Sequence, residues 1–140
     1  RVSRGLGDVY KRQEELISRA VKARKNAYMP YSNYAVGAAV LGENGEIYQG
    51  CNVENASYPA GMCAERNAIG AAVAMGAGKI MALAVTGSEE HFTMPCGICR
   101  QVISEFHIPL VITAKTCSDY KIFTGEDLLP CAFSASDVKR

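Results

Sequence analysis

Three cysteines and one glutamate, in two short segments, have the residue types and spacing of a catalytic metal site. The first segment reads Cys63-Ala64-Glu65-Arg66, and the second reads Pro95-Cys96-Gly97-Ile98-Cys99-Arg100. Zinc binds cysteine sulfur readily, and a catalytic zinc site keeps its fourth position open for water. Glu65 follows the first ligand by two residues, which brings its carboxylate within reach of that water without making it a ligand. We therefore predict a zinc site with three ligands, Cys63, Cys96 and Cys99.

The chemistry expected of such a site divides between the metal and Glu65. A carboxylate can accept a proton first and return it later, so Glu65 is predicted to be the proton shuttle. Both segments read as points where a loop enters a helix, and a helix N-terminus favours thiolate over thiol. Three thiolates overcompensate the charge of zinc. We expect Arg66 or Arg100 to offset this charge by donating hydrogen bonds to the sulfurs.

Each part of this pattern also has an ordinary structural explanation. Taken alone, a C-x-x-C also fits a redox pair or half of a structural zinc site. A structural site needs a fourth ligand, which Cys51, Cys117 or Cys131 could supply, although none of them lies in a second C-x-x-C. Glu65 alone would be an acid stabilised in the first turn of a helix. The joint pattern favours catalysis over these explanations.

The composition argues against several classes of protein. The chain has 140 residues, a formal net charge of +1 and 21% charged residues. This balance disfavours a nucleic-acid-binding stripe or a polybasic membrane segment. No apolar run approaches the roughly 20 residues that span a bilayer, and the N-terminus does not read as a signal peptide. In such a chain a C-x-x-C indicates metal binding or catalysis. We predict a cytoplasmic protein without nucleic-acid or membrane partners.

The elements that would position the site follow one another as helices and short apolar strands. Residues 1–13 have no initiating Met and no apolar periodicity, so we expect a non-native or disordered extension that is left out of the fold. Residues 14–140 are predicted to form one domain. Helices are expected at 14–29, 63–75, 97–106 and 126–129, and strands at 35–41, 47–53, 80–86, 110–114 and 121–123. This order predicts an α/β fold, a three-layer α/β/α domain with a mixed sheet of about five strands.

Further segments establish a resemblance to a known family. They are Tyr31-Ser32, Val36-Gly37-Ala38-Ala39, Asn52-Val53-Glu54-Asn55-Ala56, and Leu128-Leu129-Pro130 with Phe133. Together with the two cysteine segments, they make the chain resemble the small homotetrameric cytidine deaminases of pyrimidine salvage, within the cytidine and deoxycytidylate deaminase superfamily. The resemblance extends from about residue 14 to residue 133. The zinc segments are shared by the whole superfamily, whereas the Asn-Val-Glu-Asn segment narrows the match to the cytidine branch.

The resemblance implies a reaction and a role for each matching residue. The reaction is the zinc-dependent hydrolytic deamination of cytidine and 2′-deoxycytidine to uridine and 2′-deoxyuridine, with release of ammonia. One zinc ion per subunit would be held by the three cysteines, and Glu65 would be catalytic. Asn52 and Glu54 would hold the ribose hydroxyls. Tyr34 would pack near the base, and Ala64 would also bind the substrate.

The resemblance also implies a homotetramer in which neighbouring subunits share their active sites. The residues contributed across the interface would be Ala56, Tyr58 and Phe133, so monomers should be nearly inactive. One residue departs from the family pattern, because Tyr34 replaces the more usual Phe. The ring is kept, but the added hydroxyl needs a hydrogen-bond partner or water.

Three other functions compete with nucleoside deamination. A deaminase that edits nucleic acid needs basic and aromatic surface for a strand, which the near-neutral charge and the absence of Trp disfavour. A deaminase of a blasticidin-type antibiotic is a nearer alternative, although Asn52 to Asn55 fits cytidine deaminases better. A structural zinc module without catalysis would have four protein ligands rather than three and a water.

Overall fold

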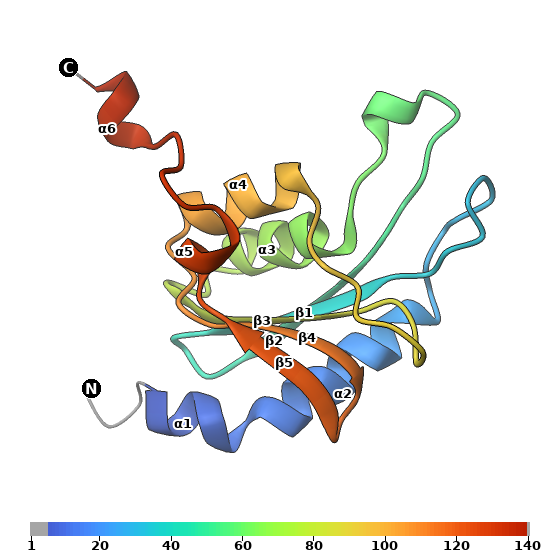
Figure 1. The fold of residues 1–140 in the computed structure, drawn as a ribbon, viewed down its shortest axis with the longest axis horizontal. Coiled ribbons are helices and arrows are strands. Elements are labelled where there is room, and N and C mark those ends of the chain that lie inside the picture. The colour runs from blue at the N-terminus through green and yellow to red at the C-terminus, as the bar shows by residue number, and fades with distance from the viewer. Residues whose placement is uncertain (1–5, 140) are drawn as a thin grey trace.

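The computed structural model describes residues 6–139, which build a five-stranded sheet (Figure 1). The strands are β1 (Gly37–Gly42), β2 (Ile47–Cys51), β3 (Ile80–Thr86), β4 (Val111–Thr116) and β5 (Asp119–Phe123). Their order across the sheet is β2-β1-β3-β4-β5. The β3–β4 pair is parallel and the other three pairs are antiparallel. The predicted mixed sheet of about five strands is therefore confirmed.

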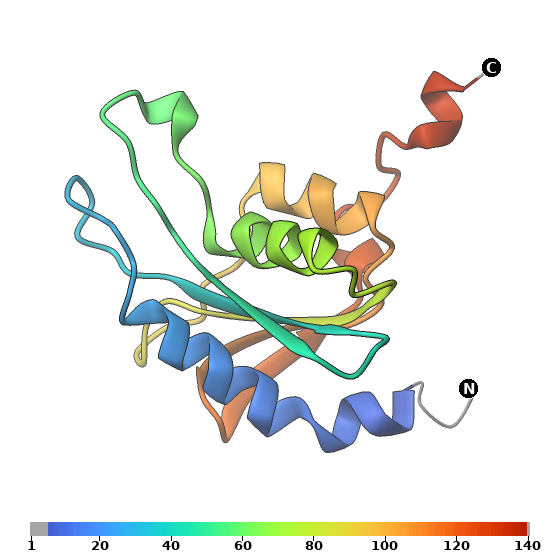
Figure 2. The same ribbon diagram turned by 180° about the vertical axis from the view of Figure 1, so that it is seen from behind.

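Helices cover both faces of this sheet. Helix α2 (Gln13–Arg24) lies against one face, and α3 (Ala64–Ala74) and α4 (Gly97–Glu105) lie against the other (Figures 1 and 2). A parallel pair of strands needs a crossover connection, and α4 lies in the segment that connects β3 with β4. The predicted three-layer α/β/α arrangement is confirmed.

The two faces of the sheet have separate hydrophobic cores. On the α2 side, Leu16 and Ile17 pack with alanines and with Ile112 of the sheet. On the α3 and α4 side, Val85 and Ile103 belong to the second cluster. Successive strand residues point to opposite faces, so a strand with helices on both sides is apolar throughout. This explains why β1 and β3 read as continuous apolar runs.

A glycine in β2 allows α3 to lie close to the sheet. A Cβ atom added at Gly50 would lie 2.6 Å from the carbonyl oxygen of Ala64 and would also collide with the backbone nitrogen of Ala68. No side chain can be placed at that distance without moving the helix. Gly50 therefore fixes the first turn of α3, where Glu65 lies.

The observed bounds differ from the predicted ones most at the C-terminal end of α2, and by at most two residues at the other predicted elements. Strand β3 spans the predicted residues, but α2 ends at Arg24, before the predicted limit at Pro30. The chain turns after Arg24 because Tyr28 forms a bridge with Val53 instead of continuing the helix. Helix α5 spans Gly125–Leu128, close to its predicted place. Three short elements were not predicted, helix α1 (Leu6–Lys11), the 3-10 helix η2 (Tyr58–Ala60) and helix α6 (Ala135–Val138).

Residues 6–13 correct one prediction. Leu6–Lys11 form helix α1, and Val9 is 1% exposed within the core on the α2 side. Gln13 begins α2 and accepts a hydrogen bond from the Tyr120 hydroxyl at 2.9 Å. Leaving residues 1–13 out of the fold was therefore wrong for residues 6–13, while residues 1–5 lie outside the described part. So short a helix, with Val9 as its buried contact, gives no periodicity to detect.

Two segments extend away from the body of the domain. We call residues 52–62, which include η2, the arm, and residues 129–139, which end in α6, the tail. Figures 1 and 2 show both projecting on the side of the sheet that carries α3 and α4. Within residues 6–139, no helix is long and apolar enough to cross a membrane.

Candidate metal centre

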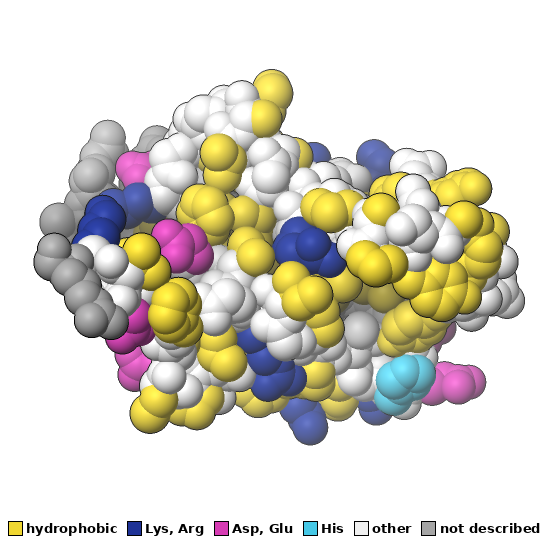
Figure 3. Space-filling model, turned by 90° about the horizontal axis from the view of Figure 1, so that it is seen from above, with side chains coloured by type: hydrophobic (Ala, Val, Ile, Leu, Met, Phe, Trp, Pro, Cys, Tyr) yellow, Lys and Arg dark blue, Asp and Glu magenta, His cyan; other side chains and the backbone are white. Residues whose placement is uncertain are grey.

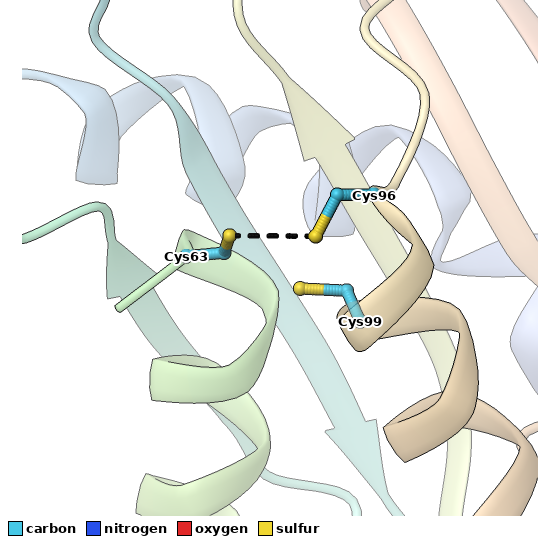
Figure 4. A group of neighbouring side chains, drawn as sticks. All are labelled: Cys63, Cys96 and Cys99. Atoms are coloured by element: carbon cyan, nitrogen blue, oxygen red, sulfur yellow. Dashed lines mark hydrogen bonds between the residues drawn. The ribbon is translucent and has the colours of Figure 1, made fainter. Parts of the chain in front are cut away.

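Two helix N-termini bring the three predicted ligands together (Figure 4). Cys63 is the N-cap residue of α3, Cys96 is the N-cap residue of α4, and Cys99 lies in the first turn of α4. Their sulfur atoms all lie within 4.8 Å of one another. The sulfur atoms of Cys63 and Cys96 are 3.7 Å apart. The positive ends of both helices therefore face one group of thiols, which favours the thiolate form.

The spacing of the sulfur atoms fits zinc. Tetrahedral zinc bound at about 2.3 Å from each sulfur requires sulfur atoms about 3.8 Å apart, whereas a disulfide requires about 2.05 Å. The Cys63–Cys96 distance of 3.7 Å matches the zinc geometry. In the described part of the chain, the cluster contains no fourth His, Cys, Asp or Glu. The donor set thus leaves one position of a tetrahedral ion open.

Glu65 lies beside this cluster without belonging to it. Its side chain is in the first turn of α3 and is 3% exposed. Burial disfavours the charged carboxylate and raises the pKa of Glu65 to about 7. A carboxyl group with a pKa near neutrality can both accept and donate a proton at that pH. This is the behaviour that a proton shuttle requires.

The pKa values of Cys63 and Cys99 are shifted in opposite directions. The Cys99 thiol beside Cys63, with a further contribution from Arg66, lowers the pKa of Cys63 to about 5. The same contact, together with burial, raises the pKa of Cys99. One guanidinium nitrogen of Arg66 donates to the Cys63 sulfur at 3.7 Å. The predicted arginine–sulfur contact is therefore present for Arg66.

Arg100 does not make the contact that was predicted for it. Its Nε donates to the carbonyl oxygen of Pro95 at 2.7 Å, and its NH1 nitrogen donates to the carbonyl oxygen of Leu128 at 3.0 Å. The expected hydrogen bond from Arg100 to a sulfur is replaced by these backbone contacts. Arg100 thus ties the residue before Cys96 to the end of α5.

The predicted ribose-binding residues lie on the strand end and arm that follow β2. Glu54 accepts hydrogen bonds from the backbone nitrogens of Tyr31 and Ser32, at 2.9 and 3.1 Å, and from the Ser32 hydroxyl. These donors, the Ser32 hydroxyl first, lower the pKa of Glu54. The Asn52 side chain donates to the carbonyl oxygen of Tyr34 at 2.8 Å and accepts from the nitrogen of Val36 at 2.9 Å. Both side chains are held in fixed orientations.

The hydroxyl of Tyr34 has a protein partner. It forms a hydrogen bond with the Thr93 hydroxyl, and the Tyr34 ring stacks on His91 with ring centroids 6.3 Å apart and planes inclined by 7°. Tyr34 is 37% exposed, so part of the ring surface faces solvent. The departure from the more usual Phe is thus accommodated by a residue 59 positions along the chain.

The residues predicted to act across a subunit interface lie on the arm and the tail. A cavity of about 320 Å³ beside Glu54 has Tyr58 among its lining residues. The Tyr58 side chain is 74% exposed and Phe133 is 63% exposed; Ala56 is also exposed. On the side of α3 and α4, Figure 3 shows hydrophobic side chains interspersed with polar and charged ones, with the largest hydrophobic group toward the right of the view. In a single chain, these three residues are therefore open to a partner.

Three residues that support the site were not singled out from the sequence. Ser32 orients Glu54, Thr93 holds the Tyr34 hydroxyl, and Arg24 donates to the carbonyl oxygens of Ala35 and Gly87. A serine or threonine in a polar loop gives no signal of its own. The Tyr34 hydroxyl, which needs a partner, was the one indication that such a residue existed.

Comparison with known proteins agrees with this geometry. The sequence model described as the cytidine and deoxycytidylate deaminase zinc-binding region matches residues 10–115. A cytidine deaminase of Sporosarcina psychrophila is 47% identical over 128 residues, which cover 89% of this chain and 93% of that protein. A cytidine deaminase of Halalkalibacterium halodurans is 40% identical, over 90% of this chain and 97% of its own length.

Solved structures show the same likeness. A crystal structure of cytidine deaminase from Burkholderia pseudomallei has a TM-score of 0.80 and 45% identity, over 85% of this chain and 97% of that chain. At 18% identity, the cytidine deaminase from Bacillus anthracis still has a TM-score of 0.63, which shows a shared fold. Family match, sequence identity and fold all agree with the three-cysteine centre and its buried glutamate. The chain belongs to the cytidine and deoxycytidylate deaminase family.

Proposed function

We propose that this protein catalyses the zinc-dependent hydrolytic deamination of cytidine and 2′-deoxycytidine to uridine and 2′-deoxyuridine, with release of ammonia. The observation that carries the proposal is a group of three thiols at zinc spacing beside the buried Glu65. Relatives that share 40–47% of the sequence over nearly their whole length are named cytidine deaminases. Fold and donor set together favour this reaction over a structural zinc module.

The proposed mechanism uses Glu65 as the group that moves protons. When bound by the three thiolates, zinc supplies the acidification that makes water a nucleophile near neutral pH. Glu65 takes the proton that the water loses and donates it to the ring nitrogen of cytosine. The carbon that carries the amino group forms a bond to oxygen and breaks its bond to nitrogen. Glu65 then takes the remaining proton of the added oxygen and passes it to the amino group, which leaves as ammonia while the carbonyl of uridine forms.

Substrate recognition is assigned to four residues, Asn52 and Glu54 for the ribose, and Tyr34 and Ala64. Glu54 keeps a free lone pair for a ribose hydroxyl, and Asn52 keeps a second N–H and a second lone pair. Losing a ribose hydroxyl would leave these oriented groups unpaired, which gives discrimination. Tyr34 packs near the base. Ala64, the first residue of α3, has a backbone N–H without a helical acceptor and is assigned to substrate binding as well.

We propose that the active enzyme is a homotetramer with shared sites. The arm carries Ala56 and Tyr58, and the tail carries Phe133, all in segments that project from the domain (Figure 1). Two of these residues, Tyr58 and Phe133, are large apolar side chains that are mostly exposed in the single chain, which supports a role at a subunit interface. In the tetramer, each of these three residues completes the site of a neighbouring subunit.

The biological setting follows from the substrate. Oriented ribose-binding groups suit a free nucleoside better than a nucleic acid, so we assign the protein to pyrimidine salvage in the cytoplasm. The activity is placed in a single domain, to whose core residues 6–13 also contribute through Val9.

The test is release of ammonia from cytidine by the zinc-loaded protein, compared with the Glu65→Gln variant. We expect the rate to fall by at least about 100-fold in the variant, because general acid–base catalysis typically contributes that much or more. Bound zinc, measured by metal analysis, should remain. The matched control is Glu105→Gln, which makes the same change at an exposed position at the end of α4.

The outcomes separate the reaction from the shuttle. No ammonia from cytidine or deoxycytidine, with zinc bound and the protein assembled, would reject the proposed function. Full activity in Glu65→Gln would reject the shuttle while leaving the reaction in place.

A further inference from the structure

The Tyr34 hydroxyl joins two loops that are far apart in the sequence. One is the 31–36 loop, which precedes β1, and the other is the 87–95 loop, which connects β3 to α4. The Tyr34 hydroxyl forms a hydrogen bond with Thr93, 59 residues further along the chain. The ring of Tyr34 also stacks on His91 of the same loop. One side chain thus makes two different contacts with the 87–95 loop.

The hydroxyl pair is packed against backbone. A Cβ atom added at Gly87 would lie 2.6 Å from the Tyr34 hydroxyl oxygen and would also collide with the Thr93 hydroxyl. Gly87 is buried at the end of β3. The two hydroxyls therefore meet over a position that has no room for a side chain. The close packing on Gly87 keeps both hydroxyls in place, since neither can shift toward the end of β3.

The remainder of the 87–95 loop is held at other points. Arg24 donates to the carbonyl oxygens of Ala35 and Gly87 at 3.1 and 3.0 Å, which ties the same two loops at their bases. The ammonium groups of Lys115 and Lys121 each lie 4.7 Å from the centroid of the Phe92 ring. Between these anchors and Cys96, the Tyr34 hydroxyl is the group that holds Thr93.

On the other side, Tyr34 belongs to the hydrogen bonds that orient the predicted ribose-binding residues. Its backbone nitrogen donates to the Ser32 hydroxyl oxygen at 3.1 Å, and that hydroxyl donates to Glu54. Its carbonyl oxygen accepts from Asn52 at 2.8 Å. A continuous series of hydrogen bonds therefore runs from Glu54 through Ser32 and Tyr34 to Thr93, three residues before Cys96.

We propose that the Tyr34 hydroxyl and Thr93 act together as one positioning unit. Their hydrogen bond holds the 31–36 loop, which orients the predicted ribose-binding residues, in a fixed place relative to the 87–95 loop, which leads to the metal ligand Cys96. Neither hydroxyl needs to touch the reacting atoms. Their bond fixes the distance between two halves of the site, so that a substrate held by Glu54 is presented to the metal side in one orientation. In its kinetic part, this inference rests on the proposed deamination of cytidine.

The kinetic test compares Tyr34→Phe, Thr93→Val and the double variant with the unmodified enzyme. Tyr34→Phe keeps the ring and the stacking on His91, and Thr93→Val keeps the shape of the side chain. Each single change should raise KM for cytidine about three- to tenfold, the range expected for one hydrogen bond, while kcat changes less than about twofold. The double variant should match the single variants, because both remove the same bond.

Two further variants serve as controls. Thr93→Ser restores the hydroxyl and should restore KM. Ser88→Ala removes another hydroxyl of the same loop, one that accepts from the Glu90 nitrogen at 2.9 Å, and should leave KM unchanged. Effects on KM that multiply in the double variant, or single variants with unchanged KM, would overturn the proposal.

A second readout does not depend on turnover. Amide hydrogen exchange of the 87–95 loop should become faster to the same extent in Tyr34→Phe, Thr93→Val and the double variant, and should not change in Ser88→Ala. If the unmodified protein released no ammonia from cytidine, the proposed function would fail, and unchanged exchange in the variants would show that the link fails too. An active enzyme with unchanged KM and exchange would reject this inference alone.

Discussion

Arg66 and Arg100 each end one of the two cysteine segments, but their guanidinium groups have different hydrogen-bond partners. Arg66 donates to the sulfur of Cys63, and its Nε is buried without a hydrogen-bond partner among the described residues. Arg100 uses its guanidinium for two backbone carbonyls. The sequence could not tell which arginine contacts a sulfur, because the direction of each side chain depends on which side of its helix faces the cysteine cluster. Arg66 therefore stabilises the negative charge of a thiolate, whereas Arg100 fixes the position of the backbone before Cys96.

Substituting these two arginines should therefore have different effects. Arg66→Ala should lower zinc affinity about 10- to 100-fold, the range found for groups that support metal ligands. Arg100→Ala should lower the free energy of unfolding by about 1–3 kcal/mol, because two carbonyl acceptors lose their donor. Zinc affinity is measured by competition with a chelator, and stability by denaturant unfolding of the zinc-loaded proteins. Unchanged zinc affinity in Arg66→Ala would contradict its assigned role.

The unequal cysteines predict a pH dependence of metal binding. With its pKa lowered to about 5, Cys63 is a thiolate at neutral pH, whereas Cys99, whose pKa is raised, keeps its proton. Zinc must displace that proton, so zinc affinity should rise as pH rises and fall as pH falls. Calorimetry at about pH 7, in two buffers of different ionisation enthalpy, should detect at least one proton released per zinc bound. A zinc-binding enthalpy independent of the buffer would contradict the assignment.

At the scale of single elements, the packing of α3 on β2 sets the place of Cys63 and Glu65. Gly50→Ala should push α3 away from the sheet, since the new methyl group would lie 2.6 Å from the Ala64 carbonyl oxygen. We expect a loss of about 1–3 kcal/mol in unfolding free energy, together with weaker zinc binding. A destabilised protein with unchanged zinc affinity would show that the site tolerates movement of α3.

Gly70, which lies on α3 itself, provides the matched control for Gly50→Ala. A Cβ atom added there would meet nothing within 4 Å. Gly70→Ala should therefore stabilise the protein by about 0.4–1 kcal/mol, because alanine restricts the unfolded chain more than glycine does. Denaturant unfolding measures both variants, and a loss of stability in Gly70→Ala would show that the helix surface is not free there.

The elements that could be predicted from the sequence are those that are determined by residues close to them in the chain. Strand β3 and the start of α4 were readable because an apolar run and a cysteine pair are local patterns. The end of α2 was not, since it depends on the bridge between Tyr28 and Val53 across the fold. Helix α6 had a readable signal that was missed, a capping box between Ser134 and Asp137. For the Thr93 contact, the sequence indicated only that the Tyr34 hydroxyl needs a partner, because 59 residues separate the two.

At the scale of the whole molecule, the proposed shared site predicts complementation between inactive chains. Glu65→Gln subunits lack the shuttle, and Phe133→Ala subunits lack the side chain offered to a neighbour. Mixed tetramers contain some sites with an intact Glu65 and a neighbour with an intact Phe133, so ammonia release should reappear on mixing. Each variant refolded alone is the control. Mixed tetramers that form but remain inactive would contradict sharing through Phe133.

The placement of the ligands also links metal binding to folding. Cys63 and Cys96 are separated by 33 residues, and the whole of β3 lies between them. Strand β3, which follows α3 and precedes α4 in the chain, lies between β1 and β4 in the sheet. An ion held by Cys63, Cys96 and Cys99 would therefore close a long loop that contains β3. Zinc would stabilise chains in which β3 is in place relative to unfolded ones, so that metal binding contributes to the free energy of folding.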